Sequence, residues 1–488
     1  MEGRAGGRGS ARFAVLLALV TLIGAGIISV VTSRGSGEPA AATPTPASTT
    51  TTTAAAAPVS IAVATTTAPT ATSTTTTTTT TTTIPQPRLL EIVAVPDNAS
   101  ISINTSDGLG ITSEGVLSEM VVGPVELAIE AEGYQAHRET LEADADTELM
   151  VWLDRPGQLL HKIAQWSTAG APKQVAFTPD NQEIWVTLLS GAGFQVFDRN
   201  GGLIAAVELP EAGSVEVIFN RAGTRGYVSQ METASVYEID VATREVLRKL
   251  DTGGVWTKVM ALSPDEATLW ASNWVSNNVS EIDLATGEVR RKLSTVTTPR
   301  GLYVTPNGAR LYVAGFEHGE IEVFDLATGD SEVIYHSGGA MRHLVGDPAT
   351  GLMYASDMAR HHVLVVDTAT DEVAVLADVD RVPNTIDLSP DGKVLYVSNR
   401  GRNNPETYYK PGPEWGTVVV IDTATGNYLD AIIGGNQTTG LDVSPDGTML
   451  AYSDFLDDRV TVYEIPPYED LLAGDGGRWE AHLAEIPK

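Results

Sequence analysis

Apolar and polar positions alternate in short runs along most of the chain, and from residue 157 to residue 465 these runs form a repeat. The period is about 42 residues, and each period holds four predicted strands. A Pro-Asp-Gly-type turn follows the first strand, and an aspartate at the end of the third opens an Ala-Thr-Gly-type turn, as in VSEIDLATGEVRRK at residues 279–292. Four short antiparallel strands at this period predict one blade of a β-propeller.

The number of first-strand turns predicts seven blades, with turns at Pro179, Asn220, Pro264, Pro306, Pro348, Pro390 and Pro445. The seventh repeat ends after its third strand. Residues 157–164 resemble a fourth strand and precede the first complete repeat, so we expect them to complete the last blade. Such closure leaves no exposed strand edge in the ring. The predicted fold class is therefore all-β, with a seven-bladed propeller over residues 157–465.

The N-terminal part of the chain predicts an anchor and a stalk. Residues 13–31 are apolar and uncharged and follow Arg4, Arg8 and Arg12, which is typical of a membrane-spanning signal anchor with residues 1–12 in the cytoplasm. A cleaved signal peptide is the alternative. Residues 35–87 are rich in Thr, Ala and Pro and predict a disordered linker. We expect a single-pass protein of the cell membrane whose C-terminal bulk is extracytoplasmic.

Two further segments flank the repeats. Residues 88–154 contain strands of alternating polarity separated by turn residues and predict a small β-sandwich-like domain. Its sequences PDNA at 96–99, GIT at 110–112 and EGY at 132–134 resemble the PEGA domain, which implies a surface spacer without known chemistry. Residues 466–488 are expected to form a short, dispensable polar tail.

The repeat motifs resemble the YVTN family of propeller repeats, which is related to YncE-like and lactonase-like seven-bladed proteins. The resemblance rests on SPDGKVLYVSN at 389–399, SPDG at 444–447 and the DxATG turns. It implies the fold. The recurring Asp, Pro, Thr and Gly residues form turns, so we do not interpret them as catalytic groups or metal ligands.

Composition limits the chemistry that the chain can perform. The absence of cysteine among the 488 residues excludes disulfides and zinc–thiolate sites. The net charge of −31 argues against general binding to nucleic-acid phosphates or anionic lipids. His318, His343, His361 and His362 show no metal-binding spacing and are interpreted as solvated loop residues. We expect no metal, no cofactor and no catalytic residues.

One position at the start of each first strand should surround the mouth of the central channel. Aligned on the turns, it holds Lys173, Ser214, Lys258, Arg300, Arg342, Asn384 and Thr439. Four cations in a strongly acidic chain predict a binding site for an anion. The alternative is that these cations pair with acidic loop residues of neighbouring blades. Trp256 and Trp274 are expected to pack together on the same face.

The sixth repeat contains an insertion, RGRNNPETYYKPGPEWG at residues 400–416. Arginine, tyrosine and tryptophan are enriched at binding hot spots, and this loop offers Arg400, Arg402, Tyr408, Tyr409, Lys410 and Trp415. We predict a lid over the channel mouth or a recognition surface. The alternative is a loop that packs only on its own blade.

These patterns favour a binding or scaffold module for an envelope protein, a wall polymer or a small anionic molecule, with a monomeric propeller. The first alternative is a lactonase-like hydrolase with its site at the channel mouth. The second is single-stranded nucleic-acid binding, because aromatic and basic residues adjoin in the sixth insertion. The net charge and the predicted location count against nucleic acid.

Overall fold

The computed structural model describes residues 86–106, 108–474 and 476–486. The predicted cytoplasmic segment, signal anchor and nearly all of the linker lie outside these residues. Within the described part of the chain, no helix is both long and apolar enough to cross a membrane.

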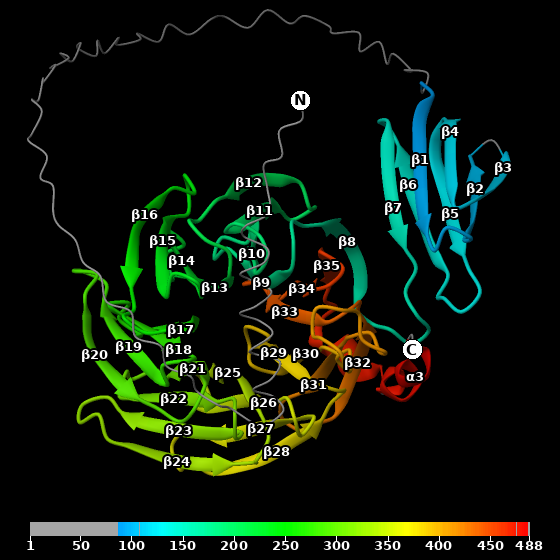
Figure 1. Cartoon of the computed structure of the whole chain (residues 1–488). Helices are drawn as coiled ribbons and strands as arrows, with labels where there is room; N and C mark the ends of the chain where they lie inside the picture. The colour runs from blue at the N-terminus through cyan, green and yellow to red at the C-terminus, as the bar shows by residue number, and fades with distance from the viewer. Residues whose placement is uncertain (1–85, 107, 475, 487–488) are drawn as a thin grey trace, which may run out of the picture.

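Residues 161–464 form four-stranded antiparallel sheets arranged like the blades of a propeller around a centre (Figure 1). The first strand of each sheet lies innermost and the fourth outermost, so the first strands surround the central channel. The sheets are β9 (Pro172–Phe177), β10 (Glu183–Leu188), β11 (Phe194–Asp198), β12 (Leu203–Val207); β13 (Ser214–Phe219), β14 (Arg225–Gln230), β15 (Ser235–Asp240), β16 (Val246–Asp251); β17 (Thr257–Leu262), β18 (Thr268–Asn273), β19 (Asn278–Asp283), β20 (Val289–Ser294); β21 (Pro299–Val304), β22 (Arg310–Gly315), β23 (Glu320–Asp325), β24 (Ser331–His336); β25 (Met341–Asp347), β26 (Leu352–Asp357), β27 (His362–Asp367), β28 (Val373–Asp378); β29 (Pro383–Leu388), β30 (Val394–Asn399), β31 (Thr417–Asp422), β32 (Tyr428–Ile433); and β33 (Thr438–Val443), β34 (Met449–Asp454), β35 (Arg459–Glu464) with β8 (His161–Ser167).

The strand that precedes the repeats completes the last sheet. β8 pairs antiparallel with β35, with Ser167 opposite Arg459 and His161 opposite Glu464. This pairing confirms the predicted role of the segment, although the strand begins at His161 rather than at residue 157. Both ends of the repeat region are thereby joined in one sheet, and the edge that β35 would otherwise expose is covered.

Hydrophobic side chains fill the spaces between neighbouring sheets. Each sheet shares a buried cluster with the next, and the last sheet shares one with the first through residues such as Val175 and Val460. Successive side chains of a strand point to opposite faces, so each central strand contributes to two clusters. This explains why the second strand of each sheet is buried along nearly its whole length.

The recurring aspartates act as predicted, by closing turns. Asp283 Oδ1 accepts hydrogen bonds from the backbone N–H groups of Ala285 (2.7 Å) and Thr286 (3.0 Å). Gly287 adopts a φ of +78° and donates its N–H to the Asp283 carbonyl at 2.7 Å. These hydrogen bonds all lie within the turn, which agrees with a structural role for Asp283.

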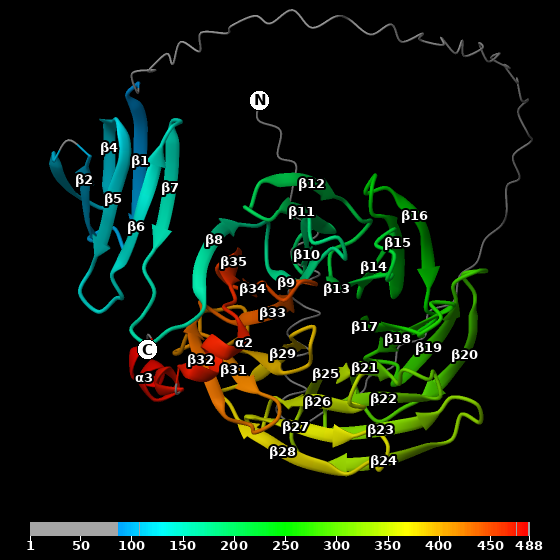
Figure 2. The ribbon, with the colours of Figure 1, turned by 180° about the vertical axis from the view of Figure 1, so that it is seen from behind.

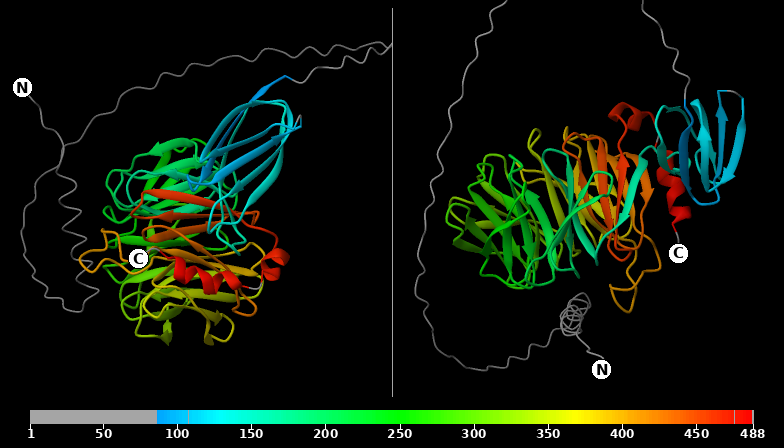
Figure 3. Two further views of the ribbon diagram at one scale, coloured as in Figure 1. Left: turned by 90° about the vertical axis from the view of Figure 1, so that its right-hand side faces the viewer. Right: turned by 90° about the horizontal axis from the view of Figure 1, so that it is seen from above.

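Residues before the ring form a separate β unit beside it (Figures 1 and 3). One sheet contains β4 (Val116–Val121), β1 (Arg88–Val95) and β7 (Thr147–Trp152), and the other contains β3 (Gly110–Glu114), β2 (Ser100–Thr105), β5 (Gly123–Glu130) and β6 (His137–Ala143). Their inner faces share a buried core that includes Ile92, Ile101 and Ile129. The predicted sandwich-like arrangement is confirmed by these two packed sheets.

The C-terminal segment differs from the predicted polar tail. It forms α2 (Tyr468–Ala473) and α3 (Gly477–Glu485), which lie against the ring near β32 (Figure 2). Trp479 stacks on Tyr428 with ring centroids 3.9 Å apart. His482 is fully buried, with Nε2 2.7 Å from Asp380 Oδ2. The segment therefore packs on the ring, and its polar composition did not indicate this because its few anchoring side chains are separated by exposed polar residues.

Candidate functional site

A repeated hydrogen bond fixes the start of five of the first strands relative to the preceding sheet. A Ser or Thr hydroxyl on the second strand donates to a main-chain carbonyl of the next first strand: Thr187 to Val215 (3.0 Å), Ser272 to Arg300 (3.0 Å) and Ser356 to Asn384 (2.7 Å). The same hydroxyl also accepts a backbone N–H of its own sheet in most repeats, as at Val259 and Thr385. The main chain of the channel-lining residues is therefore fixed to the preceding sheet.

This register corrects one predicted position. Val215, not Ser214, is equivalent to Arg300 and Asn384, because its carbonyl accepts the inter-sheet hydroxyl. Ser214 pairs with Gln230, as Thr257 pairs with Asn273 one repeat later. The turn-based alignment was off by one residue here because Asn220 occupies the position of Thr305 and not that of Pro306: its N–H donates to the Arg225 carbonyl as that of Thr305 donates to Arg310. The remaining six predicted positions keep their equivalence.

Five cationic side chains, which we call the mouth cations, come together at one end of the channel. They are Lys173, Lys258, Arg300, Arg342 and Arg400, and each is at most 7% exposed. Among the described residues, none of the five has a carboxylate oxygen within 4 Å. The alternative of pairing with acidic loop residues is therefore not what the structure shows.

The mouth cations are surrounded by aromatic side chains. Lys258 Nζ lies 3.9 Å from the centroid of the Trp274 ring and 3.1 Å from Met231 Sδ. The Arg300 guanidinium lies 5.2 Å from the Trp274 ring and 5.6 Å from the ring of Phe316. Aromatic faces stabilise cations, but they leave the positive charge uncompensated.

Burial and mutual repulsion act on these cations in the same direction. Burial, followed by the charges of Arg300 and Arg342, holds the pKa of Lys258 well below its usual range. Burial also lowers the pKa of Arg300 to about 10. The pKa of Lys173 is likewise held well below its usual range, by burial and then by Arg400. A cluster whose members disfavour one another's charge is a site that an anion would stabilise.

Glu216 is the acidic residue whose charge acts most widely on the cluster. It lies on β13, is buried, and influences Arg342 and Arg300 without contacting them within 4 Å. Burial raises its pKa to about 7, and these arginines oppose the rise. Glu216 immediately follows Val215 and is not among the site residues predicted from the sequence.

Several polar atoms at the mouth have no hydrogen-bond partner among the described residues. They are Nε of Arg300, Nε of Arg400, and both amide atoms of Asn384. Asn384 is 0% exposed, and a buried unpaired polar group costs about 1–3 kcal/mol. A ligand with oxygen acceptors would satisfy the two guanidinium nitrogens and the amide N–H.

The sixth-repeat insertion reaches the channel mouth through three of its residues. Tyr408 lies 4.3 Å from the Arg400 guanidinium, and its hydroxyl is 3.5 Å from Lys173 Nζ. Tyr408 and Tyr409 both pack against Phe455, with ring centroids 5.2 and 6.1 Å away. Phe455 was missed because it lies on the loop after β34, far along the chain. The loop thus packs across the mouth, beyond its own blade.

The other predicted residues of the insertion lie elsewhere. Arg402 pairs with Glu414 at 3.0 Å, and Lys410 pairs with Glu406 at 2.5 Å; both cations are more than half exposed. Trp415 lines a cavity that none of the mouth cations lines. The six predicted recognition residues therefore form two groups: Arg400, Tyr408 and Tyr409 belong to the mouth, whereas Arg402, Lys410 and Trp415 do not.

Trp256 and Trp274 pack together as predicted, with ring centroids 6.0 Å apart. The four histidines do not gather. Two of them do not lie in loops as predicted: His343 lies on β25 and His362 on β27. His343 Nδ1 is 3.1 Å from the Ile386 carbonyl oxygen, and burial lowers the pKa of His343 to about 3. In the part of the chain that the structure describes, no group of three or more His, Cys, Asp or Glu residues could hold a metal ion.

Two carboxyl groups form a second buried feature on the channel strands. Asp387 Oδ2 accepts the N–H of Val443 at 2.8 Å, and Asp442 Oδ2 accepts the N–H of Phe177 at 2.7 Å. Burial raises the pKa of Asp387 to about 6, and burial together with Asp387 holds the pKa of Asp442 well above its usual range. Each carboxyl links its strand to the neighbouring sheet.

A ring of four-stranded sheets around a central channel defines a β-propeller. The chain belongs to the YncE-like β-propeller family: the sequence family described as "YNCE-like beta-propeller" matches residues 227–443. It is also similar to "Antigen Lp49" of Leptospira interrogans serogroup Icterohaemorrhagiae serovar copenhageni (strain Fiocruz L1-130), with 35% identity over 353 residues, which is 70% of this chain and 77% of that protein.

A solved structure shares the fold. The chain titled "Kuenenia stuttgartiensis Hydrazine Synthase" superimposes with a TM-score of 0.54 at 18% identity, over 62% of this chain and 97% of that one. At this identity the likeness concerns the fold alone.

Proposed function

We propose that this protein is a binding module whose channel mouth takes up a small anionic molecule. The observation that carries the proposal is the cluster of five buried mouth cations with no carboxylate within 4 Å among the described residues. Burying an uncompensated charge is costly, and a bound anion removes much of that cost. Fixed guanidinium groups can bind a carboxylate or phosphate through paired hydrogen bonds.

The insertion gives this site a cover. Tyr408 and Tyr409 shield the cations from water, and a low local dielectric strengthens their attraction for an anion. The tyrosines are held by packing on Phe455 and by a hydrogen bond from Gln437 Nε2 to the Tyr408 carbonyl at 2.5 Å. We propose that this part of the loop opens to admit the ligand and closes over it.

Titration of the full-length protein with inorganic phosphate and with citrate tests the proposal by calorimetry. Arg342→Gln removes one mouth cation, whereas Arg290→Gln removes a half-exposed arginine that pairs with Asp283 outside the channel. We expect binding to the wild type and the Arg290 variant, and a loss of about tenfold or more in the Arg342 variant, as for a charge-assisted hydrogen bond. Absence of binding, or equal binding by both variants, would refute the proposal.

We further propose that the ring is a seven-bladed propeller carried outside the cytoplasm on a signal anchor, a disordered linker and a PEGA-like domain. Support comes from the apolar run at residues 13–31, the Thr-rich residues 35–87 and the motifs at residues 96–99 and 132–134. Protease added to intact cells should digest the propeller while the protein stays in the membrane fraction. Protection of the propeller in intact cells would contradict this orientation.

A further inference from the structure

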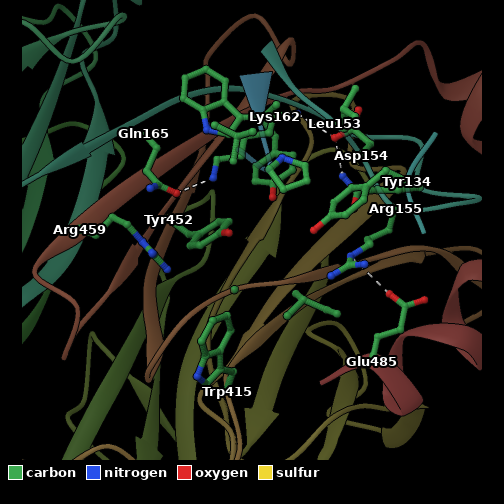
Figure 4. A pocket seen from close by; sticks show the side chains of 17 residues that line it. Tyr134, Leu153, Asp154, Arg155, Lys162, Gln165, Trp415, Tyr452, Arg459 and Glu485 are labelled. Carbon is green, nitrogen blue, oxygen red and sulfur yellow. Dashed lines mark hydrogen bonds and ion pairs between the residues drawn. The ribbon is translucent and has the colours of Figure 1, made fainter. Parts of the chain in front are cut away.

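A cavity of about 290 Å³ lies where the small β unit, the last sheet of the ring and α3 meet (Figure 4). It is separate from the mouth cations, none of which lines it. Its size is near the lower end of the range of about 300–1,000 Å³ for small-molecule sites, which preferentially occur between domains. This volume suits a ligand of one or two sugar rings.

Aromatic rings make up much of the cavity wall. The lining includes Tyr134 and Trp152 from the small β unit, Tyr452 and Tyr463 from the last sheet, and Trp415 from the sixth-repeat insertion. Trp415 is 38% exposed, which is unusual for so large an apolar side chain in this protein. The negative faces of aromatic rings suit the weakly positive C–H face of a sugar ring.

Most charged groups around the cavity already have partners. Asp154 accepts hydrogen bonds from Gln158 Nε2 (2.9 Å) and lies 2.7 Å from His161 Nδ1. Arg155 pairs with Glu485 at 3.7 Å, and Figure 4 shows this pair at one side of the hollow. Arg459 pairs with Asp454 on the opposite side. These pairs fix the wall and leave little net charge there.

Lys162 is the exception. Its ammonium is hydrogen-bonded to the neutral Gln165 side chain and lies 5.5 Å from the Trp152 ring, but among the described residues no carboxylate lies within 4 Å of it. Burial lowers its pKa to about 8, so it remains a cation at neutral pH. Lys162, Tyr134, Arg155 and Trp415 surround the same hollow in Figure 4.

We infer that this cavity binds an acidic sugar, whose carboxylate lies at Lys162 and whose ring stacks on an aromatic side chain, Trp415 foremost. Sugar hydroxyl groups can bond to Gln165 and to the Arg155 guanidinium at the cavity wall. Because the lining comes from both the small β unit and the ring, a bound sugar contacts both.

Calorimetry of the full-length protein with digalacturonate and with neutral galactobiose tests the inference. We expect the wild type to bind digalacturonate more tightly. Lys162→Met should remove this preference, and Trp415→Ala should weaken binding of both sugars about tenfold. Lys249→Met is a matched control, because Lys249 lies on β16 and pairs with Asp251 at 2.7 Å; its binding should equal that of the wild type.

A further variant separates the two sites. Arg342→Gln weakens the proposed anion site at the channel mouth but does not alter the cavity, which Arg342 does not line, so the Lys162-dependent preference for digalacturonate should persist in this variant. Loss of digalacturonate binding in this variant would place the sugar at the channel mouth and overturn the inference. Absence of binding to either sugar, or an unchanged preference in Lys162→Met, would also overturn it. Thermal unfolding of each variant confirms that it is folded.

Discussion

Replacing Lys258 by methionine should stabilise the protein while weakening its anion site. Lys258 is 5% exposed, and burial and the charges of Arg300 and Arg342 disfavour its protonation. Methionine has a similar length and carries no charge. Removal of a buried, uncompensated cation should stabilise the fold by several kcal/mol, against a loss of about 1–2 kcal/mol in cation–π interaction with Trp274, for a net gain of about 1–3 kcal/mol.

The stability difference between Lys258→Met and the wild type should depend on pH. The folded protein releases the Lys258 proton at a lower pH than the unfolded chain, whose lysine has a pKa of 10.5. The unfolded state therefore binds more protons between the folded-state pKa and pH 10.5, and the destabilising contribution of Lys258 shrinks as pH rises through that interval. The stability gain of Lys258→Met should be largest below the folded-state pKa, should fall as pH rises and should vanish near pH 10.5.

Chemical unfolding of both proteins between pH 7 and pH 10.5 measures the gain, and phosphate titration measures the accompanying loss of affinity. Lys249→Met is the control, since a surface change should alter stability by no more than about 0.5 kcal/mol. A Lys258 variant that is less stable than the wild type at pH 7, or whose gain does not change with pH, would refute the reasoning.

Two further predictions concern groups outside the mouth. The free energy of unfolding of Asp442→Asn should rise relative to that of the wild type as pH rises from about 4 to 8. The reason is that the raised pKa of Asp442 makes its ionisation costly only in the folded state. Urea unfolding that shows the same difference between variant and wild type at pH 5 and at pH 8 would contradict this. His482→Ala should lower the free energy of unfolding by roughly 1–3 kcal/mol, because Asp380 loses a buried partner 2.7 Å away. Unchanged thermal unfolding would mean that the His482–Asp380 contact contributes nothing to stability.

The sequence predicted features that depend on residues close together in the chain. The turn at Asp283 is closed by Ala285 and Thr286, and such local hydrogen bonds can be read from the residue types alone. Strand alternation indicated the all-β class, and the strand before the repeats was matched correctly to the last sheet. The family comparison and the sheets agree with this part of the prediction.

The channel-mouth site was predicted in part from the sequence, and the rest was decided by the tertiary structure. A common repeat position predicted that Lys173, Lys258, Arg300 and Arg342 lie together, because a closed ring brings equivalent positions to one end of the channel. Whether these cations have carboxylate partners depends on side-chain contacts between different sheets, which no local pattern specifies. The structure also adds Arg400 to the cluster, since the insertion turns inward at this residue.

The tertiary structure alone decided the features that join distant segments. Glu216, Phe455 and His482 come from separate parts of the chain, and each becomes informative only through its neighbours. The cavity near Lys162 exists only because the small β unit lies beside the last sheet. Sequence periodicity determined the repeated backbone, because hydrogen bonds and strand alternation are local. The chemistry of both candidate sites was decided by packing between distant segments. This packing determines how deeply each charged side chain is buried, and hence its pKa, and which groups it contacts.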